Sequence, residues 1–193
     1  MSRPSQNIDK KLIEIGKKKM IENGISSISI RSICIEAGVN LGMFYYYFKS
    51  KENFIKVLFN SMIEDLKDYW FKESEGLSSS KERLERIIFA SAKLFREKKG
   101  MFETVMKGFD FSDKFFIQLV RETHKVIYAF CYTIIDDCKN DGYLDKNIDN
   151  YKLISILFGA TMDYAKKCAE IYNNDQYNEE IGRMIELLMQ KFK

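Results

Sequence analysis

The chain has 193 residues, of which 46% are hydrophobic and 31% charged, a balance typical of a soluble folded protein. Its net charge of +3 is uneven, because residues 1–56 carry ten Lys and Arg against five Asp and Glu. No apolar run approaches the ~18 residues of a membrane span, the N-terminus is too polar for a signal peptide, and the four cysteines lack zinc spacing, so we expect a cytoplasmic protein without membrane or metal.

The spacing of apolar residues is helical almost throughout, and one proline with ten glycines leaves few turn residues for strands. We therefore predict an all-α protein of about nine helices. The division expected is a three-helix helix-turn-helix domain over residues 1–52 and a larger helical domain over residues 53–193. A helix over about 51–72 connects them, and the Ser/Gly-rich stretch 73–80 marks a junction after it.

The first helix should cover about residues 6–23, with Gly24 as its C-terminal stop. The second begins at Ser29 or Ile30, with Ser29 as N-cap and an apolar face spaced i, i+3, i+4, i+7. Gly38 suits a left-handed C-cap, and Asn40 suits the N-cap of the next helix. Two short helices separated by a glycine turn indicate a helix-turn-helix.

The third helix should cover residues 41–48 and pack inward through Phe44 and Phe48, which lie four residues apart. The other residues then face outward, and they are small, apolar or aromatic: Leu41, Gly42, Met43, Tyr45 and Tyr46. Such a face is poor for contact with water but suits a binding surface, and helix-turn-helix geometry favours a DNA groove. The basic N-terminal part is consistent with contacts to phosphates.

The rest of the chain predicts a capped helix from Ser79 to a stop at Gly100, followed by helices at about 113–139, 150–172 and 179–192. The last two carry more apolar surface than one core needs, which favours a two-fold dimer through a four-helix bundle. A fully buried central helix is the alternative. The residues expected at the dimer interface are Ile156, Phe158, Gly159, Met162, Ile181, Met184, Ile185 and Leu188.

The run from Gly24 to Glu52 is similar to the DNA-binding domain of tetracycline-repressor (TetR) family regulators. The matching positions include Ser29-Ile30-Arg31, Ala37-Gly38-Val39-Asn40, Phe44-Tyr45-x-Tyr47-Phe48 and Ser50-Lys51-Glu52. The resemblance covers about residues 8 to 58. It implies a homodimeric transcriptional regulator, most often a repressor, that binds a palindromic operator and releases it when a small molecule occupies the C-terminal domain.

The resemblance also implies roles for single residues. Ser29 and Arg31 would meet the DNA backbone or a base edge, and Leu41, Gly42 and Met43 would face the bases. Tyr45, Tyr47 and Lys51 would reach phosphates, while Tyr46 could lie in the groove or pack. Because Leu41 and Met43 cannot form bidentate hydrogen bonds, we expect contacts with thymine methyl groups, an A·T-rich operator and polar readout by Arg31.

Aromatic residues of the larger domain could line a pocket for an apolar or aromatic effector or fill a core. The candidate pocket residues are Phe89, Phe102, Phe109, Phe111, Phe116, His124 and Tyr128. No catalytic group or cofactor motif is evident, so we expect neither an enzyme nor a bound cofactor. The alternative function is an all-α protein interaction module whose tyrosine patch, Tyr45 to Tyr47, grips a partner helix.

Overall fold

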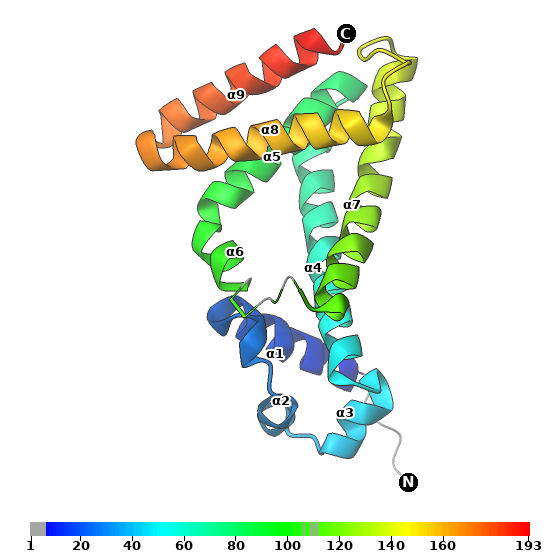
Figure 1. Cartoon of the computed structure of the whole chain (residues 1–193), viewed down its shortest axis with the longest axis vertical. Helices are drawn as coiled ribbons and strands as arrows, with labels where there is room; N and C mark the ends of the chain where they lie inside the picture. The colour runs from blue at the N-terminus through cyan, green and yellow to red at the C-terminus, as the bar shows by residue number, and fades with distance from the viewer. Residues whose placement is uncertain (1–6, 106, 109, 111) are drawn as a thin grey trace. The chain divides into compact units, whose positions relative to one another are not determined.

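The computed structural model describes residues 7–105, 107–108, 110 and 112–193, apart from the side chain of residue 102. Within these residues there are nine α-helices, one turn of 3-10 helix and no strand (Figure 1). The expectation of an all-α fold is confirmed. The helices are α1 (Ile8–Asn23), α2 (Ile30–Ala37), α3 (Leu41–Phe48), α4 (Lys51–Ser74), α5 (Ser80–Glu97), α6 (Lys99–Val105), α7 (Lys114–Asn140), α8 (Asn150–Ile171) and α9 (Asn174–Lys191), and the 3-10 turn is η1 (Ile25–Ser27).

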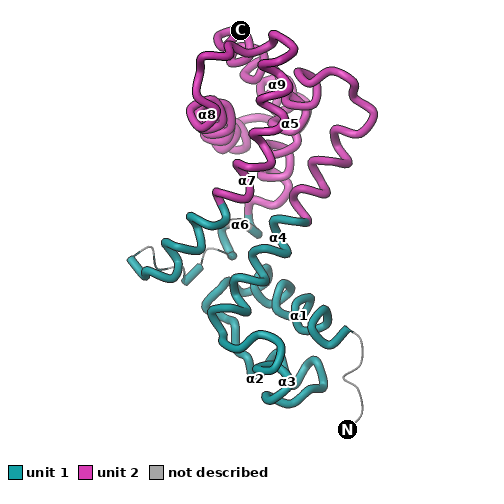
Figure 2. Tube along the Cα trace, turned by 90° about the vertical axis from the view of Figure 1, so that its right-hand side faces the viewer, with its two compact units in different colours: residues 1–64, 100–123 teal, residues 65–99, 124–193 magenta. Residues whose placement is uncertain are grey.

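The chain divides into two compact units, coloured separately in Figure 2. Unit 1 holds residues 1–64 and 100–123, and unit 2 holds residues 65–99 and 124–193. The chain passes between the units within α4, α6 and α7. These units are defined by contacts in space, whereas the expected division at residues 52 and 53 is one along the sequence, and that division stays a prediction.

The core of unit 1 joins the first four helices to a distant part of the chain. Leu12, Met20 and Ile33 are fully buried in it. Val105 of α6 and Leu119 of α7 lie in the same cluster with 5% and 2% of their surface exposed. Unit 1 therefore needs residues from beyond position 100 to complete its core. The expected helix start at Gln6 lies outside the described residues.

Unit 2 is built around α5, α8 and α9, which pack on one another. Tyr177 of α9 is 1% exposed, and its hydroxyl donates a 2.7 Å hydrogen bond to the carbonyl of Ala92 in α5. The indole nitrogen of Trp70 in α4 donates to the hydroxyl of Ser91 at 2.8 Å. Large aromatic side chains thus fill this core while their polar atoms stay hydrogen-bonded.

Two helix ends differ from the predictions. The last helix begins at Asn174 instead of near Glu179, because Asn173 and Gln176 form a capping box that starts the helix earlier. Gly100 does not end α5, which stops at Glu97 where Lys98 leaves helical geometry, and Gly100 lies inside the short helix α6.

Candidate nucleic-acid interface

The turn between α2 and α3 is fixed by the local signals that the sequence contains. The Ser29 hydroxyl accepts a hydrogen bond from the Ser32 amide at 3.4 Å, and the Asn40 side chain accepts one from the Met43 amide at 2.9 Å. Gly38 adopts the left-handed conformation, with φ 69° and ψ 34°. All three caps are as predicted, and together they set the direction in which α3 leaves α2.

The inner face of α3 carries buried aromatic side chains. Phe44 is fully buried and Phe48 is 4% exposed. The Phe48 ring meets Phe54 of α4 with 4.7 Å between centroids, in an edge-to-face arrangement. An edge-to-face aromatic pair stabilises the folded state by more than the burial of its rings alone, so this contact fixes α3 against α4.

The connection from α3 to α4 is also rigid. The amide of Asn53 donates to the Ser50 hydroxyl at 3.0 Å, which makes Ser50 the N-cap of α4, and the Asn53 side chain donates to the Phe48 carbonyl at 2.9 Å. Lys49 has a φ of 64°, and its ammonium group donates to the Tyr46 carbonyl at 2.7 Å. The positive φ of Lys49 is strained for a residue other than glycine, and the hydrogen bond stabilises it. This turn fixes the position of Lys51, the first residue of α4.

The outer face of α3 presents large apolar groups to solvent. Leu41 is 45% exposed, Tyr45 48% and Tyr46 64%. Of the other residues predicted to contact DNA, Ser29, Arg31, Gly42 and Lys51 are exposed, while Met43 and Tyr47 are half-buried. A short helix with exposed aromatic residues and cations on the adjoining helices suits contact with the groove and backbone of a nucleic acid.

One feature of this surface was missed in the sequence. Ile35 of α2 is 72% exposed and lines a shallow surface groove of about 410 Å³ together with Ser29, Arg31, Ser32 and Glu36. The sequence signal for this exposure was that Ile35 does not fall on the apolar face of α2. Ile35 and Ser32 therefore extend the candidate surface beyond the residues predicted.

An ion pair connects α1 to α2 below this surface. The Lys19 ammonium group lies 2.7 Å from the Glu36 carboxylate, and its hydrogen bond to that carboxylate holds the pKa of Glu36 below its usual value. The ion pair therefore helps to hold α1 against α2.

The residues predicted to line an effector pocket lie in different parts of the described chain or outside it, and their grouping in one pocket stays a prediction. Phe89 lines a cavity of about 610 Å³ between α5 and α9, whose lining does not include Phe116, His124 or Tyr128. Phe116 packs in unit 1 beside Phe115. His124 is exposed and stacks on Tyr128 at 5.7 Å. Phe109, Phe111 and the side chain of Phe102 lie outside the described residues.

The residues predicted at a dimer interface separate into two sets. Ile156 and Gly159 of α8 are exposed, and Phe158, Met162, Met184 and Leu188 are half-buried. Ile181 and Ile185 of α9 are 0% and 4% exposed. Their assignment to an interface is corrected, because both side chains pack into the core of unit 2 within a single chain.

The cysteine thiols are buried in the described structure. Burial raises the pKa of Cys131 to about 12, so the reactive thiolate is scarce at neutral pH. No group of three or more His, Cys, Asp or Glu within the described residues could hold a metal ion. None of the helices in the described part of the chain is long and apolar enough to cross a membrane.

Comparison with known proteins agrees with this geometry. Residues 12–58 match the family described as bacterial regulatory proteins, tetR family. No curated protein sequence matches the chain.

Several solved structures share the fold over nearly the whole length of both chains. A protein from Rhodococcus sp. assigned to the TetR family has a TM-score of 0.77 at 13% identity, with 95% of this chain and 98% of that chain covered. The fatty acid degradation regulator FadR from Bacillus halodurans has a TM-score of 0.69 at 16% identity, with 97% of each chain covered. The regulator FadR from Bacillus subtilis, solved with stearoyl-CoA, has a TM-score of 0.68 at 19% identity, with 95% and 99% covered.

At these identities the structural likeness establishes a common fold, and the family match adds the DNA-binding domain. TetR-family proteins are transcription factors and not enzymes. The chain thus has a capped helix-turn-helix with an exposed aromatic face on α3, its residues 12–58 match the tetR family of bacterial regulatory proteins, and its fold is that of the TetR-family structure compared above.

Proposed function

We propose that the protein is a homodimeric repressor that binds a palindromic operator through α2 and α3 and releases it when a small ligand occupies the C-terminal domain. The observation that carries the proposal is the outward face of α3, where Leu41, Tyr45 and Tyr46 are between 45% and 64% exposed. Apolar side chains that are largely exposed to water on a short, capped helix lower the free energy further only when a partner covers them.

The proposed contacts divide into base reading and backbone positioning. Arg31 is the candidate for polar recognition of a base, and Leu41 and Met43 contact thymine methyl groups beside Gly42. Ser29, Tyr45, Tyr47 and Lys51 position the protein on phosphates, and Tyr46 lies at the edge of the groove. Because apolar contacts dominate the base-reading set, the operator is A·T-rich and is recognised partly by its shape.

Dimerisation is proposed through α8 and α9. Ile156 is 41% exposed on α8, and Leu187 is 53% exposed on α9. Gly159 is exposed on α8 with nothing within 4 Å of the position that a Cβ would take, so a partner helix could approach its backbone closely. A two-fold dimer would present two copies of α3 at the ~34 Å spacing of successive major grooves.

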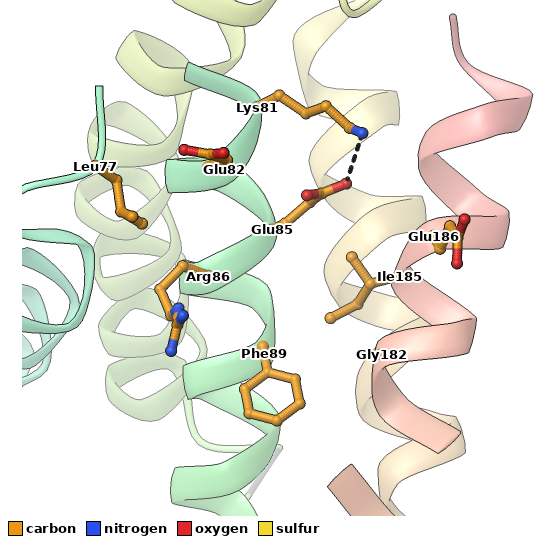
Figure 3. Close-up of a pocket in the computed structure, with 9 residues that line it drawn as sticks. All are labelled: Leu77, Lys81, Glu82, Glu85, Arg86, Phe89, Gly182, Ile185 and Glu186. Atoms are coloured by element: carbon orange, nitrogen blue, oxygen red, sulfur yellow. Dashed lines mark ion pairs between the residues drawn. The ribbon is translucent and has the colours of Figure 1, made fainter. Parts of the chain in front are cut away.

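The effector is proposed to be small and apolar or aromatic. The cavity that Phe89 lines has Leu77 and Ile185 as further apolar groups (Figure 3). At its rim Lys81 pairs with Glu85 at 3.5 Å, so part of the nearby charge is already neutralised within the protein. The likeness to a FadR structure that holds stearoyl-CoA makes a long-chain acyl-CoA the first ligand to test, with its acyl chain as the apolar group and its coenzyme A part as a charged addition to the class proposed. Ligand binding is proposed to move α4 and thereby change the distance between the two helix-turn-helix domains of the dimer.

The test is a DNA-binding measurement at several salt concentrations. Duplexes selected from a random-sequence pool, and the DNA upstream of the gene, are titrated with the purified chain. Binding to phosphates weakens steeply as salt rises, whereas an apolar protein–protein interface does not. No retention of any duplex at low salt would refute the proposal and favour an interaction module. Adding stearoyl-CoA to the bound complex then tests release, with free coenzyme A as the control.

A further inference from the structure

Lys49, between α3 and α4, has a backbone conformation that is unusual for a residue with a side chain. Its φ of 64° and ψ of −41° are close to those of a γ-turn with a positive central φ. The Ser50 amide donates to the Phe48 carbonyl at 2.7 Å, which is the hydrogen bond that spans such a turn. This conformation is strained for residues other than glycine, so the turn itself does not need a lysine side chain.

The side chain of Lys49 contacts a single residue of α3 in two ways. Its ammonium group donates a 2.7 Å hydrogen bond to the carbonyl of Tyr46, and it lies over the Tyr46 ring at 5.3 Å from the ring centroid. A cation near the C-terminus of a helix stabilises the last carbonyl groups, and a cation over an aromatic ring is attracted to the face of that ring. Both contacts therefore join the Lys49 ammonium group to Tyr46.

The Tyr46 ring also contacts Tyr47. The two rings meet edge to face, with 5.3 Å between their centroids and 86° between their planes. Tyr47 is half-buried and packs against the core of unit 1, whereas Tyr46 is 64% exposed. Fixing an exposed side chain on binding costs conformational entropy. The contacts with Lys49 and Tyr47 restrict the Tyr46 ring before it meets a partner, which lowers that cost.

We propose that Lys49 is a positioning residue of the DNA interface, whose ammonium group orders the Tyr46 ring on the exposed face of α3 in the free protein. The DNA part of this inference rests on the proposed function and deepens it, because Lys49 was not among the residues predicted to contact DNA. The two contacts with Tyr46 offset the strain of the Lys49 backbone. Strained backbone of this kind occurs mostly at functional sites.

A direct contact between Lys49 and a phosphate is the other use of the same cation, and the two roles predict different results. A positioning residue acts only through Tyr46, so its removal has no effect once the Tyr46 ring is gone. A phosphate contact acts without Tyr46, and its loss lowers the slope of log K against log salt by about 1. A double-mutant cycle combined with a salt titration therefore separates the two roles.

The cycle consists of Lys49→Met, which keeps a long flexible side chain, Tyr46→Ala and the double variant. Lys49→Met should weaken binding of a duplex selected from a random-sequence pool by about three- to fivefold, the range for an exposed cation–π contact, with an unchanged salt slope. In the Tyr46→Ala background the same substitution should have no further effect. Lys49→Arg should retain binding, because a guanidinium group preserves the charge and the hydrogen-bond donors.

Lys49→Gly separates DNA binding from stability. It removes the strain of the positive φ together with the ammonium group. It should therefore be more stable than Lys49→Met in chemical denaturation, yet bind DNA as weakly as Lys49→Met does. Lys72→Met is the control for loss of charge, because Lys72 is an exposed lysine in the last turn of α4 and should leave DNA affinity unchanged.

A readout without DNA tests the positioning itself. In nuclear magnetic resonance spectra of the free chain carrying isotope-labelled tyrosine, Tyr46→Phe identifies the ring signals of Tyr46. Lys49→Met should shift these signals, because the cation over the ring is lost, and Lys72→Met should leave them in place.

Unshifted Tyr46 signals in Lys49→Met would overturn the proposal, as would wild-type DNA affinity in Lys49→Met or Lys49→Gly. Equal losses of affinity with and without the Tyr46 ring, or a lower salt slope in Lys49→Met, would overturn it in favour of a direct phosphate contact. If the wild-type chain binds no duplex, the proposed function fails instead, and the spectra alone still decide whether Lys49 orders Tyr46.

Discussion

The ring of Phe44 in α3 meets the ring of Phe54 in α4 edge to face, with 5.0 Å between their centroids. Both side chains are fully buried. Because α3 has only eight residues, its position depends on this contact more than on its own helical stability. Phe44 therefore holds α3 in position, whereas the exposed residues of α3 are the ones proposed to contact DNA.

Phe44→Ala should therefore destabilise the protein by about 3–5 kcal/mol, the usual effect of removing a buried aromatic ring. Tyr46→Ala, at a site 64% exposed, should leave stability nearly unchanged and weaken DNA binding. Chemical denaturation and fluorescence anisotropy with a selected duplex measure the two effects. Equal destabilisation by both substitutions would contradict this division of roles.

Lys51→Ala should weaken DNA binding similarly for all sequences and reduce the slope of log K against log salt by about 1, the effect of losing one phosphate contact. Lys72→Ala is the control, because Lys72 is also an exposed lysine of α4 but lies in its last turn. A salt titration of both variants decides the point. An unchanged slope in Lys51→Ala would remove that residue from the proposed interface.

Thymine methyl recognition can be tested on the DNA itself. Replacing thymine by uracil at single operator positions removes one methyl group and should weaken binding by the wild-type chain at the positions that Leu41 or Met43 contacts. In Leu41→Ala the same replacement should have no further effect at the Leu41 position, because the methyl contact is already lost. Additive losses at every position would exclude this contact.

The pair between Lys19 and Glu36 should make stability depend on pH. The folded pKa of Glu36 is lowered, so the pair stabilises the folded state above the unfolded pKa, ~4.3 for Glu, and this contribution is lost as pH falls through the folded pKa. Glu36→Gln should thus lower the melting temperature slightly at neutral pH, and the difference should vanish in strong acid. Glu14→Gln, which alters a 3.8 Å pair with Lys17 on α1, provides a comparison.

The dimer proposal predicts different outcomes for two isoleucines. Ile156→Glu should leave the chain folded but shift it toward monomer, because Ile156 is 41% exposed on α8. Ile181→Glu should unfold unit 2, because Ile181 is fully buried. Light scattering after size-exclusion chromatography gives the mass, and circular dichroism gives the fold. Phe71→Glu, at a site 68% exposed on α4, is the surface control.

Local signals in the sequence were sufficient for the helix-turn-helix. Ser29 and Asn40 cap the helices that they were predicted to cap, and Gly38 turns the chain as expected. The reason is that caps and turns depend on hydrogen bonds between residues close in sequence. The inward placement of Phe44 follows in the same way from helical periodicity, so the sequence alone determined the fold class and the candidate DNA-binding face.

Only the tertiary structure decided which apolar surfaces meet. Periodicity marks a stripe on α9 as apolar but cannot say whether it faces its own chain or a partner, and Ile181 and Ile185 proved to face their own core. It also could not bring Val105 and Leu119 into the core of unit 1. These contacts join residues far apart in sequence, and they depend on the packing of whole helices, which no local pattern encodes.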